Sequence, residues 1–89
     1  MKVVWAPDAL ADYRKWQTRE PRMAQKIERL IADIKRNPFT GIGKPEPLRR
    51  NMTGLWSRRI TEEHRFVYRV SGARQERRLE ILQCRFHYR

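Results

Sequence analysis

The chain has little cysteine, little acidic charge and no long apolar run. Its single cysteine, Cys84, excludes an internal disulfide and is typical of a protein of the reducing cytoplasm. No stretch approaches the roughly 20 apolar residues that a membrane span needs. Pro7 and Asp8 also interrupt the first apolar residues before a signal peptide could form. We therefore expect a cytoplasmic protein that does not enter the membrane.

Cationic side chains are what the sequence has in excess. Lys and Arg number 21 against 10 Asp and Glu, which gives a formal net charge of +11 over 89 residues. A chain of this length closes one hydrophobic core, so residues 1–89 are expected to form a single domain. The charge favours a polyanionic partner, because each phosphate contact releases condensed counterions. Charge alone does not distinguish RNA from DNA, from an acidic protein or from an anionic membrane surface.

The sequence offers few candidates for a metal site or for a loop that binds nucleotide phosphates. Cys84 and His87 have a spacing that zinc sites use in turns, but on a strand the two side chains point to opposite faces. His64 is the only other histidine, so we expect no metal site and no cofactor. The glycines at Gly41 and Gly43 do not match the spacing of a phosphate-binding loop.

The first half of the sequence predicts a strand and two helices. Residues 2–5 form a short apolar strand, and a helix begins near Pro7 and ends at Glu20-Pro21. Its apolar stripe consists of Leu10, Tyr13 and Trp16. A second helix follows and ends at Asn37-Pro38. Its apolar face is Ile27, Leu30, Ile31 and Ile34, and the residues predicted to face elsewhere are Lys26, Arg29, Asp33 and Arg36.

The second half changes to a period of two. Residues 39–47 are rich in glycine and proline and predict a loop that becomes an edge strand near Leu48. Strands are then expected over residues 55–61 and 65–70, and a last strand is expected from Leu79 to the terminus, with turns and a loop between them. Two helices followed by hairpin-linked strands predict an α+β fold. In it a small, largely antiparallel sheet carries both helices on one face.

Strand alternation directs several cations to the uncovered face. Phe66 and Tyr68 are apolar and belong against the helices, so Arg65 points away from them. The same count puts Arg59 on the uncovered face. It leaves Arg58 on the covered face, which is uncomfortable unless Arg58 lies at the margin of the sheet.

The last strand contributes two more polar side chains by the same argument. Alternation assigns Leu82, Cys84 and Phe86 to the core, which leaves Arg85 and His87 on the uncovered face. Any one of these cations is more often a solvated surface charge, and a lone histidine is more often incidental. Their shared face and the overall charge favour a functional surface.

The sequence carries the groups that could cleave a phosphodiester bond in RNA, although alternation does not place Glu46 and gives Tyr88 the parity of a core residue. Glu46 is a carboxylate held between Pro45 and Pro47, and His87 and Tyr88 bring two proton-transfer side chains. A non-catalytic module that binds RNA or the ribosome fits the composition equally well. Glu46 discriminates between the two, because a carboxylate among phosphates helps a nuclease and not a binder.

Three segments resemble the YoeB toxins of the RelE-like superfamily. They are Lys44-Pro45-Glu46-Pro47-Leu48, residues 54–65 and Cys84-Arg85-Phe86-His87-Tyr88. The resemblance implies a small sheet with two helices and a ribosome-dependent endoribonuclease that cleaves mRNA in the A site. It also implies a frequent homodimer and neutralisation by an acidic antitoxin of the YefM type. Arg89 extends beyond the His-Tyr pair with which family members commonly end.

The resemblance also implies roles for individual residues. Glu46 becomes the general base, Arg65 the cation that stabilises the phosphate and His87 the general acid, with Tyr88 as the alternative acid. The supporting site residues that it implies are Lys44, Arg49, Arg59, Glu63 and Tyr88. Arg85, which alternation places on the same face, is added as an RNA contact.

Overall fold

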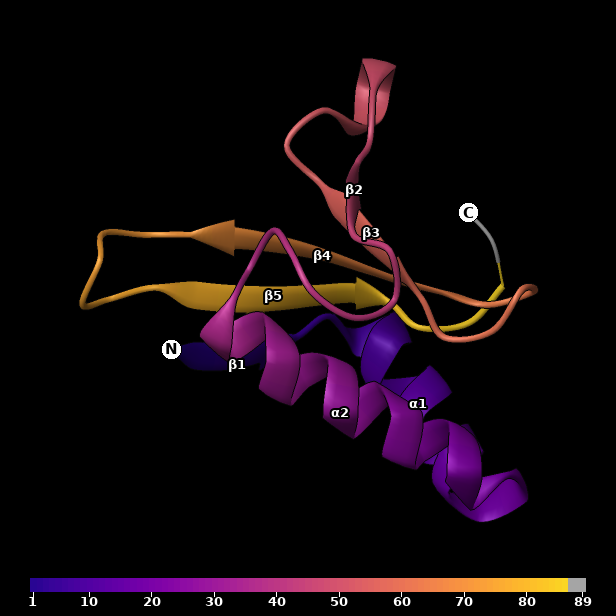
Figure 1. Cartoon of the computed structure of the whole chain (residues 1–89). Coiled ribbons are helices and arrows are strands. Elements are labelled where there is room, and N and C mark those ends of the chain that lie inside the picture. The colour runs from indigo at the N-terminus through magenta and orange to yellow at the C-terminus, as the bar shows by residue number, and fades with distance from the viewer. Residues whose placement is uncertain (87–89) are drawn as a thin grey trace.

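The computed structural model describes residues 1–86 and shows an α+β fold of two layers. Its elements are β1 (Lys2–Trp5), α1 (Pro7–Arg19), α2 (Pro21–Arg36), β2 (Glu46–Pro47), the 3₁₀ turn η1 (Arg50–Met52), β3 (Trp56–Arg59), β4 (Arg65–Ser71) and β5 (Arg78–Gln83). Figure 1 shows both helices on one side of the sheet and the β2–β3 hairpin extending away from them. The predicted fold class is confirmed.

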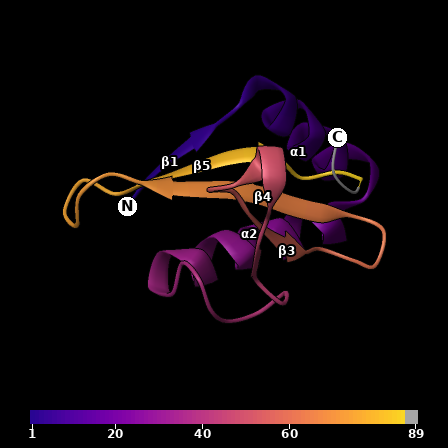
Figure 2. The same cartoon turned by 90° about the horizontal axis from the view of Figure 1, so that it is seen from above.

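The sheet is antiparallel except at one edge. Its strand order is β1-β5-β4-β3-β2, and only the β1–β5 pair is parallel among the pairs described. After β1 the chain enters α1 and α2, which carry it to β2 at the opposite edge. Figure 2 shows α1 beside β1 and β5 and α2 towards β3, so the helices cover different parts of one face. The other face stays free for a site.

The helix boundaries follow from local chemistry. α1 begins at Pro7 and α2 at Pro21. Proline lacks an N–H, and this costs nothing in the first turn, where N–H groups have no partner within the helix. Glu20, with φ −151° and ψ 77°, separates the two helices. α2 ends at Asn37, whose backbone is extended ahead of Pro38, as the sequence predicts. Within residues 1–86, no helix has the length and apolar character to cross a membrane.

The core lies between the helices and the covered face of the sheet. Its fully buried members include Ile27 and Ile34 of α2 and Phe66 and Tyr68 of β4, as the alternation predicted. Trp16 is also buried, and its indole N–H donates to the Cys84 carbonyl oxygen at 2.9 Å. This bond ties α1 to the end of β5.

Each helix buries one acidic residue, and one of the two departs from the prediction. Asp12 is buried in α1, where Leu10 and Tyr13 are only half-buried. Asp33 is buried in α2, although it was predicted to face away from the core. That prediction is wrong because Asp33 has a buried cationic partner, Arg58, which compensates for its desolvation.

A β-bulge shifts the alternation of β5. Tyr68 lies opposite Ile81, but Val67 lies opposite Gln83, so Leu82 is an extra residue in the strand. The assignment of Leu82 to the core is therefore wrong. Leu82 is half-buried and, with Val67 and Gln83, lines a pocket.

β5 also ends earlier than predicted. The strand stops at Gln83, and Cys84 is fully buried as expected. Phe86, which was assigned to the core, is 45% exposed and has a φ of +61°. The reason is that the chain leaves the regular ladder here, and the Phe86 carbonyl accepts a hydrogen bond from the Arg65 N–H at 2.8 Å.

Candidate functional site

The strand register brings three predicted site residues to one face. Glu46 lies opposite Ser57, and Arg59 lies opposite Arg65. Residues paired across antiparallel strands project from the same face, and this parity is opposite to that of the core residues Phe66 and Tyr68. The uncovered face of β2, β3 and β4 thus carries a carboxylate and two guanidinium groups. We call this set, Glu46, Arg59 and Arg65, the charged strip.

Glu46 is exposed on the two-residue edge strand β2. The prolines on either side of it restrict the backbone and remove two amide donors, which an edge strand tolerates. The pairing continues beyond Pro47, where the Leu48 N–H donates to the Leu55 carbonyl at 2.9 Å. Glu46 is therefore a solvent-accessible carboxylate on a restrained backbone.

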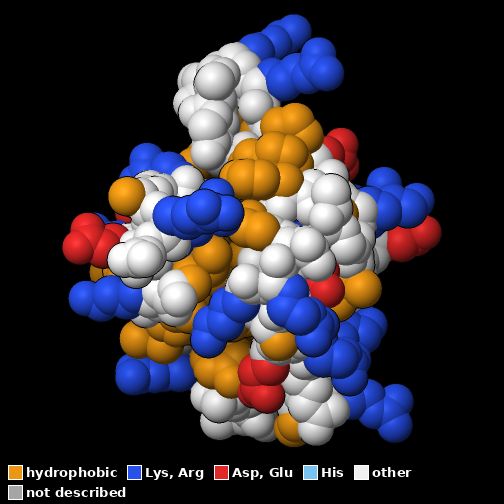
Figure 3. Space-filling model, turned by 60° about the vertical axis from the view of Figure 1, so that its left-hand side comes forward, with side chains coloured by type: hydrophobic (Ala, Val, Ile, Leu, Met, Phe, Trp, Pro, Cys, Tyr) orange, Lys and Arg blue, Asp and Glu red, His pale blue; other side chains and the backbone are white. Residues whose placement is uncertain are grey.

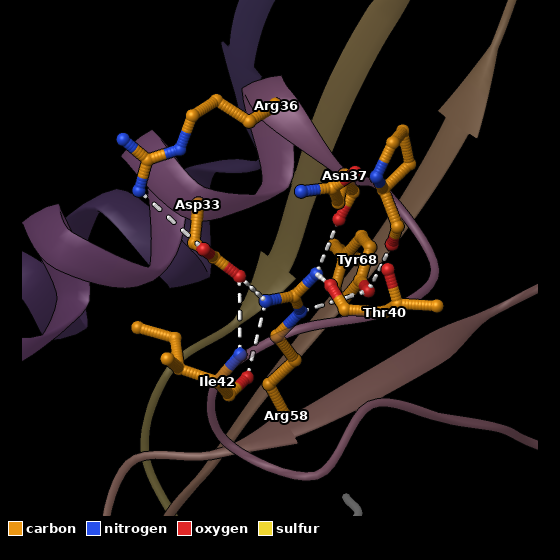
Figure 4. A network of polar contacts seen from close by, with 8 residues as sticks. Asp33, Arg36, Asn37, Thr40, Ile42, Arg58 and Tyr68 are labelled. Atoms are coloured by element: carbon orange, nitrogen blue, oxygen red, sulfur yellow. Dashed lines mark hydrogen bonds and ion pairs between the residues drawn. The ribbon is translucent and has the colours of Figure 1, made fainter.

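Arg58 holds the loop that leads to Glu46. Its side chain is fully buried, and its Nη1 lies 2.5 Å from Asp33 Oδ2. The guanidinium also donates to three loop carbonyls, those of Asn37 at 2.6 Å, Thr40 at 2.8 Å and Ile42 at 3.0 Å (Figure 4). Alternation made the core parity of Arg58 acceptable only if the residue lay at the margin of the sheet. The structure instead places Arg58 in the core.

Two further groups complete this buried network. The Tyr68 hydroxyl donates to the Pro38 carbonyl at 2.7 Å, and Asp33 Oδ2 accepts the Ile42 N–H at 3.1 Å. The hydrogen bond from Arg58 lowers the pKa of the Asp33 carboxyl despite its burial. Burial raises the pKa of Tyr68. The loop of residues 37–42 is therefore held by an ionised pair and a neutral phenol.

The residues that follow this loop, Gly43 and Lys44, lie next to Arg59 and lead to Glu46. The Gly43 carbonyl accepts the Arg59 N–H at 2.7 Å. Gly43 has a φ of +79°, and an added Cβ would lie 3.0 Å from the Arg59 carbonyl oxygen. Lys44 follows in the left-handed region at φ 50° and is exposed. The buried network thus fixes the start of the segment that carries Lys44 and Glu46.

Arg65 differs from a free surface cation. It is only 7% exposed, and its Nη1 donates to the carbonyls of Thr61 and Glu62, each at 2.8 Å, and of His64 at 3.3 Å. These carbonyls belong to the turn between β3 and β4. Arg65 therefore has a fixed guanidinium, in contrast to the exposed Arg59.

The remaining predicted residues are more dispersed. Arg49 is exposed beside η1, and Figure 3 shows cationic side chains at the top of the projecting hairpin. Glu63 is exposed on the β3–β4 turn. The prediction that Arg85 faces the charged strip is wrong: its guanidinium lies 5.7 Å from the Trp16 ring centre and 4.6 Å from that of Phe86. It packs towards α1 because β5 has already ended. His87 and Tyr88 lie outside the described residues.

A pocket adjoins the charged strip. Its walls are apolar apart from one carboxylate and one amide, and its lining residues are Asp8, Met52, Leu55, Val67, Leu82 and Gln83. Val67 lies opposite Ser57 and Gln83, so the pocket belongs to the uncovered face. Within residues 1–86, no group of three His, Cys, Asp or Glu side chains could hold a metal ion.

Alternation missed two residues that support the site, Asp33 and Arg58. The available signal was the core parity of Arg58, since a buried guanidinium requires a buried anion. The sequence offers many carboxylates and does not say which one is the partner. His64 was also missed. Its Nδ1 accepts the Phe86 N–H at the end of β5, a contact that depends on a turn geometry that spacing does not reveal.

Comparison with known proteins supplies the family. Residues 5–88 match the family model of the YoeB-like toxins of bacterial type II toxin–antitoxin systems. The chain belongs to this family. Toxin YoeB of Escherichia coli K12 is 50% identical over 88 residues, which cover 99% of this chain and 100% of the relative.

Solved structures of the family have the same fold. The YoeB/ParE toxin from Agrobacterium tumefaciens is 59% identical, with a TM-score of 0.95 over 99% of this chain and 100% of that chain. YoeB from Staphylococcus aureus is 40% identical, with a TM-score of 0.88 over 99% of this chain and 98% of that chain. The Staphylococcus protein has been solved both as a dimer and in a heterotetrameric complex with YefM.

Proposed function

We propose that the chain is a cytoplasmic, ribosome-dependent endoribonuclease that cleaves mRNA in the A site. The observation that carries this proposal is the charged strip: Glu46, Arg59 and Arg65 share the uncovered face of three adjacent strands. A carboxylate beside two guanidinium groups combines a proton acceptor with sites for the phosphate oxygens. Membership of a toxin family supports the same function.

The reaction uses the nucleophile that RNA itself carries. Glu46 removes the proton of the 2′-hydroxyl, the oxygen attacks the adjacent phosphorus, and the 5′-oxygen leaves. His87 protonates the leaving oxygen, and Tyr88 is the alternative acid. Each positioned acid or base contributes about 10²- to 10⁴-fold. Arg59 and Arg65 stabilise the charge that develops on the non-bridging oxygens, which is worth about 10²- to 10³-fold for one donor.

Arg59 and Arg65 contribute differently to stabilising the negative charge on the phosphate. Arg65 is held by turn carbonyls, so its positive charge is oriented before the substrate arrives and needs no reorganisation during the reaction. Arg59 is exposed and contributes more to binding the RNA backbone. Lys44, Arg49 and Glu63 are all exposed and serve as supporting contacts around the reacting groups.

The identity of the cleavage products tests the mechanism. Attack by the 2′-hydroxyl leaves a 2′,3′-cyclic phosphate or a 3′-phosphate on the upstream fragment. We expect this end in an in vitro translation reaction, with mapping of mRNA ends with and without the chain. Cleavage by the purified chain should also survive chelation of divalent metals other than the Mg²⁺ that keeps the ribosome intact. A 3′-hydroxyl end would refute the proposed nucleophile.

We also propose that an acidic antitoxin of the YefM type neutralises the chain and that the chain forms a homodimer. A chain with a net charge of +11 that cleaves mRNA would poison its host unless a partner masks the basic surface. The complexes known for the Staphylococcus relative support both partners.

The affinity of the antitoxin should fall as salt rises, because ion pairs at the interface are screened. Titrating the purified partner into the chain at increasing ionic strength measures this. Parallel translation reactions should lose cleavage as the partner binds. High-level expression of the chain alone without growth arrest would contradict the proposal.

The alternative is a non-catalytic module that uses the same face to bind RNA or the ribosome. It explains the two arginines of the charged strip and the exposed Lys44. It does not explain why a restrained carboxylate, Glu46, stands beside them, since that carboxylate repels phosphate. We therefore favour the nuclease, and the Glu46 variants described in the Discussion separate the two.

A further inference from the structure

His64 contacts the end of β5 from the turn that precedes β4. Its Nδ1 accepts a hydrogen bond from the backbone N–H of Phe86, with a distance of 2.7 Å between the two nitrogens. A ring nitrogen accepts only when it carries no proton. The contact therefore requires a neutral imidazole that is protonated at Nε2.

The imidazole is itself held in place. Its ring packs edge-on against Trp16 of α1, with centroids 4.9 Å apart and an interplanar angle of 71°. The His64 N–H donates to Thr61 Oγ1 at 3.1 Å, and its carbonyl accepts the Ile60 N–H at 3.0 Å. The side chain is only 13% exposed. His64 is thus a rigid support that links α1, the turn and β5.

Both backbone groups of Phe86, the N–H and the carbonyl, make hydrogen bonds. While His64 accepts its N–H, its carbonyl accepts from the Arg65 N–H at 2.8 Å and from Gln83 Nε2 at 3.4 Å. Its φ of +61° is rare for a residue with a side chain and persists only when the surroundings determine it. The Phe86 backbone is therefore held by these contacts and not by a strand ladder.

We propose that His64 is a positioning residue for the terminal His87-Tyr88 pair. This inference rests on the proposed nuclease function, in which that pair supplies the general acid. His64 acts through the Phe86 backbone, one residue before His87, and not on RNA. A 1 Å misplacement of a catalytic group costs on the order of 10²-fold in rate. Loss of the hydrogen bond between His64 and the Phe86 N–H should therefore lower the rate of cleavage.

Two substitutions separate acceptance at Nδ1 from mere packing. In His64→Asn the amide oxygen can take the position of Nδ1 and accept the Phe86 N–H, whereas in His64→Gln the amide reaches the position of Nε2. We expect His64→Gln to lower the single-turnover cleavage rate on saturating ribosome complexes by about 10- to 100-fold. His64→Asn should remain near the wild-type rate, and ribosome affinity should be unchanged in both. His64→Leu, which has no acceptor, should behave like His64→Gln.

A readout without cleavage tests the contact itself. Hydrogen exchange at the Phe86 amide can be followed by NMR in the full chain carrying Glu46→Ala, which avoids poisoning the host. Exchange should accelerate in His64→Gln and His64→Leu but not in His64→Asn.

The outcomes are distinct. Unchanged Phe86 exchange in both His64→Gln and His64→Leu overturns the proposal. So does an equal loss of cleavage in all three variants that follows their loss of thermal stability, because that pattern is purely structural. If the unmodified chain cleaves no mRNA, the proposed function fails, whereas Phe86 exchange still decides whether His64 holds the end of β5.

Discussion

Replacing Glu46 with glutamine should lower the maximum rate of mRNA cleavage by about 10²- to 10⁴-fold, the range for loss of a general base. Glutamine keeps the size of the side chain and removes only its ability to take a proton. Ribosome affinity should stay within a few-fold, because no cation is lost from the charged strip. Single-turnover cleavage and ribosome co-sedimentation measure the two quantities separately.

Glu76→Gln is the matched control for this experiment. Glu76 is exposed in the β4–β5 connection, at the end of β4 opposite to Arg65, and the substitution makes the same change in net charge. It should leave cleavage unaltered. A Glu46→Gln chain that cleaves at the rate of the control would remove Glu46 from the mechanism and favour the RNA-binding module.

Replacing Arg58 with methionine should destabilise the fold by about 3–5 kcal/mol, the usual cost of breaking a buried ion pair. The substitution leaves Asp33 buried without its cation and also leaves three loop carbonyls without their donor. Denaturant unfolding measures the loss. Arg69→Met is the control, because the Arg69–Glu80 pair, at 2.7 Å, is half-exposed at the arginine and should contribute no more than about 1 kcal/mol.

The double variant Arg58→Met with Asp33→Leu sharpens the interpretation. Removing both charges should recover part of the loss, since no buried ion is left uncompensated. Recovery should be incomplete because the loop carbonyls still lack donors. A single Arg58→Met variant as stable as the Arg69→Met control would show that the buried network contributes little.

The same pair predicts how stability depends on acid. Hydrogen bonding from Arg58 lowers the pKa of Asp33 in the folded state below its ordinary value. The pair's contribution is therefore complete above the unfolded pKa, about 3.9, and is lost only as the pH falls through the lower folded pKa. Arg58→Met should remove this contribution, so the difference in stability between the two chains should narrow in strong acid. The part that comes from the three loop carbonyls should remain.

Periodicity predicted most of the fold and part of the site. The stripe of α2 and the alternation of β4 each obey one dominant rule, burial of apolar side chains, so Ile27 and Phe66 were assigned correctly. The placement of Arg59 and Arg65 on one face follows from that alternation and needs no long-range information.

The wrong assignments have two causes, a pair of buried charges and a strand irregularity. Asp33 and Arg58 each look misplaced alone, and only their mutual contact makes both burials acceptable. Leu82 was misassigned because a single inserted residue, which no local signal marks, shifts the face of a strand. Such features depend on partners distant in sequence, and a pattern read along the chain does not contain them.

The loop held by Arg58 has a consequence for how members of this family can diverge. Arg58 recognises the carbonyls of Asn37, Thr40 and Ile42, so their exposed side chains take no part in holding the loop. These positions can change freely while the backbone keeps its course. Gly41 cannot, because a Cβ there would collide with Asp33 Oδ2. Natural variation and directed evolution can therefore diversify the surface of this loop without moving Glu46.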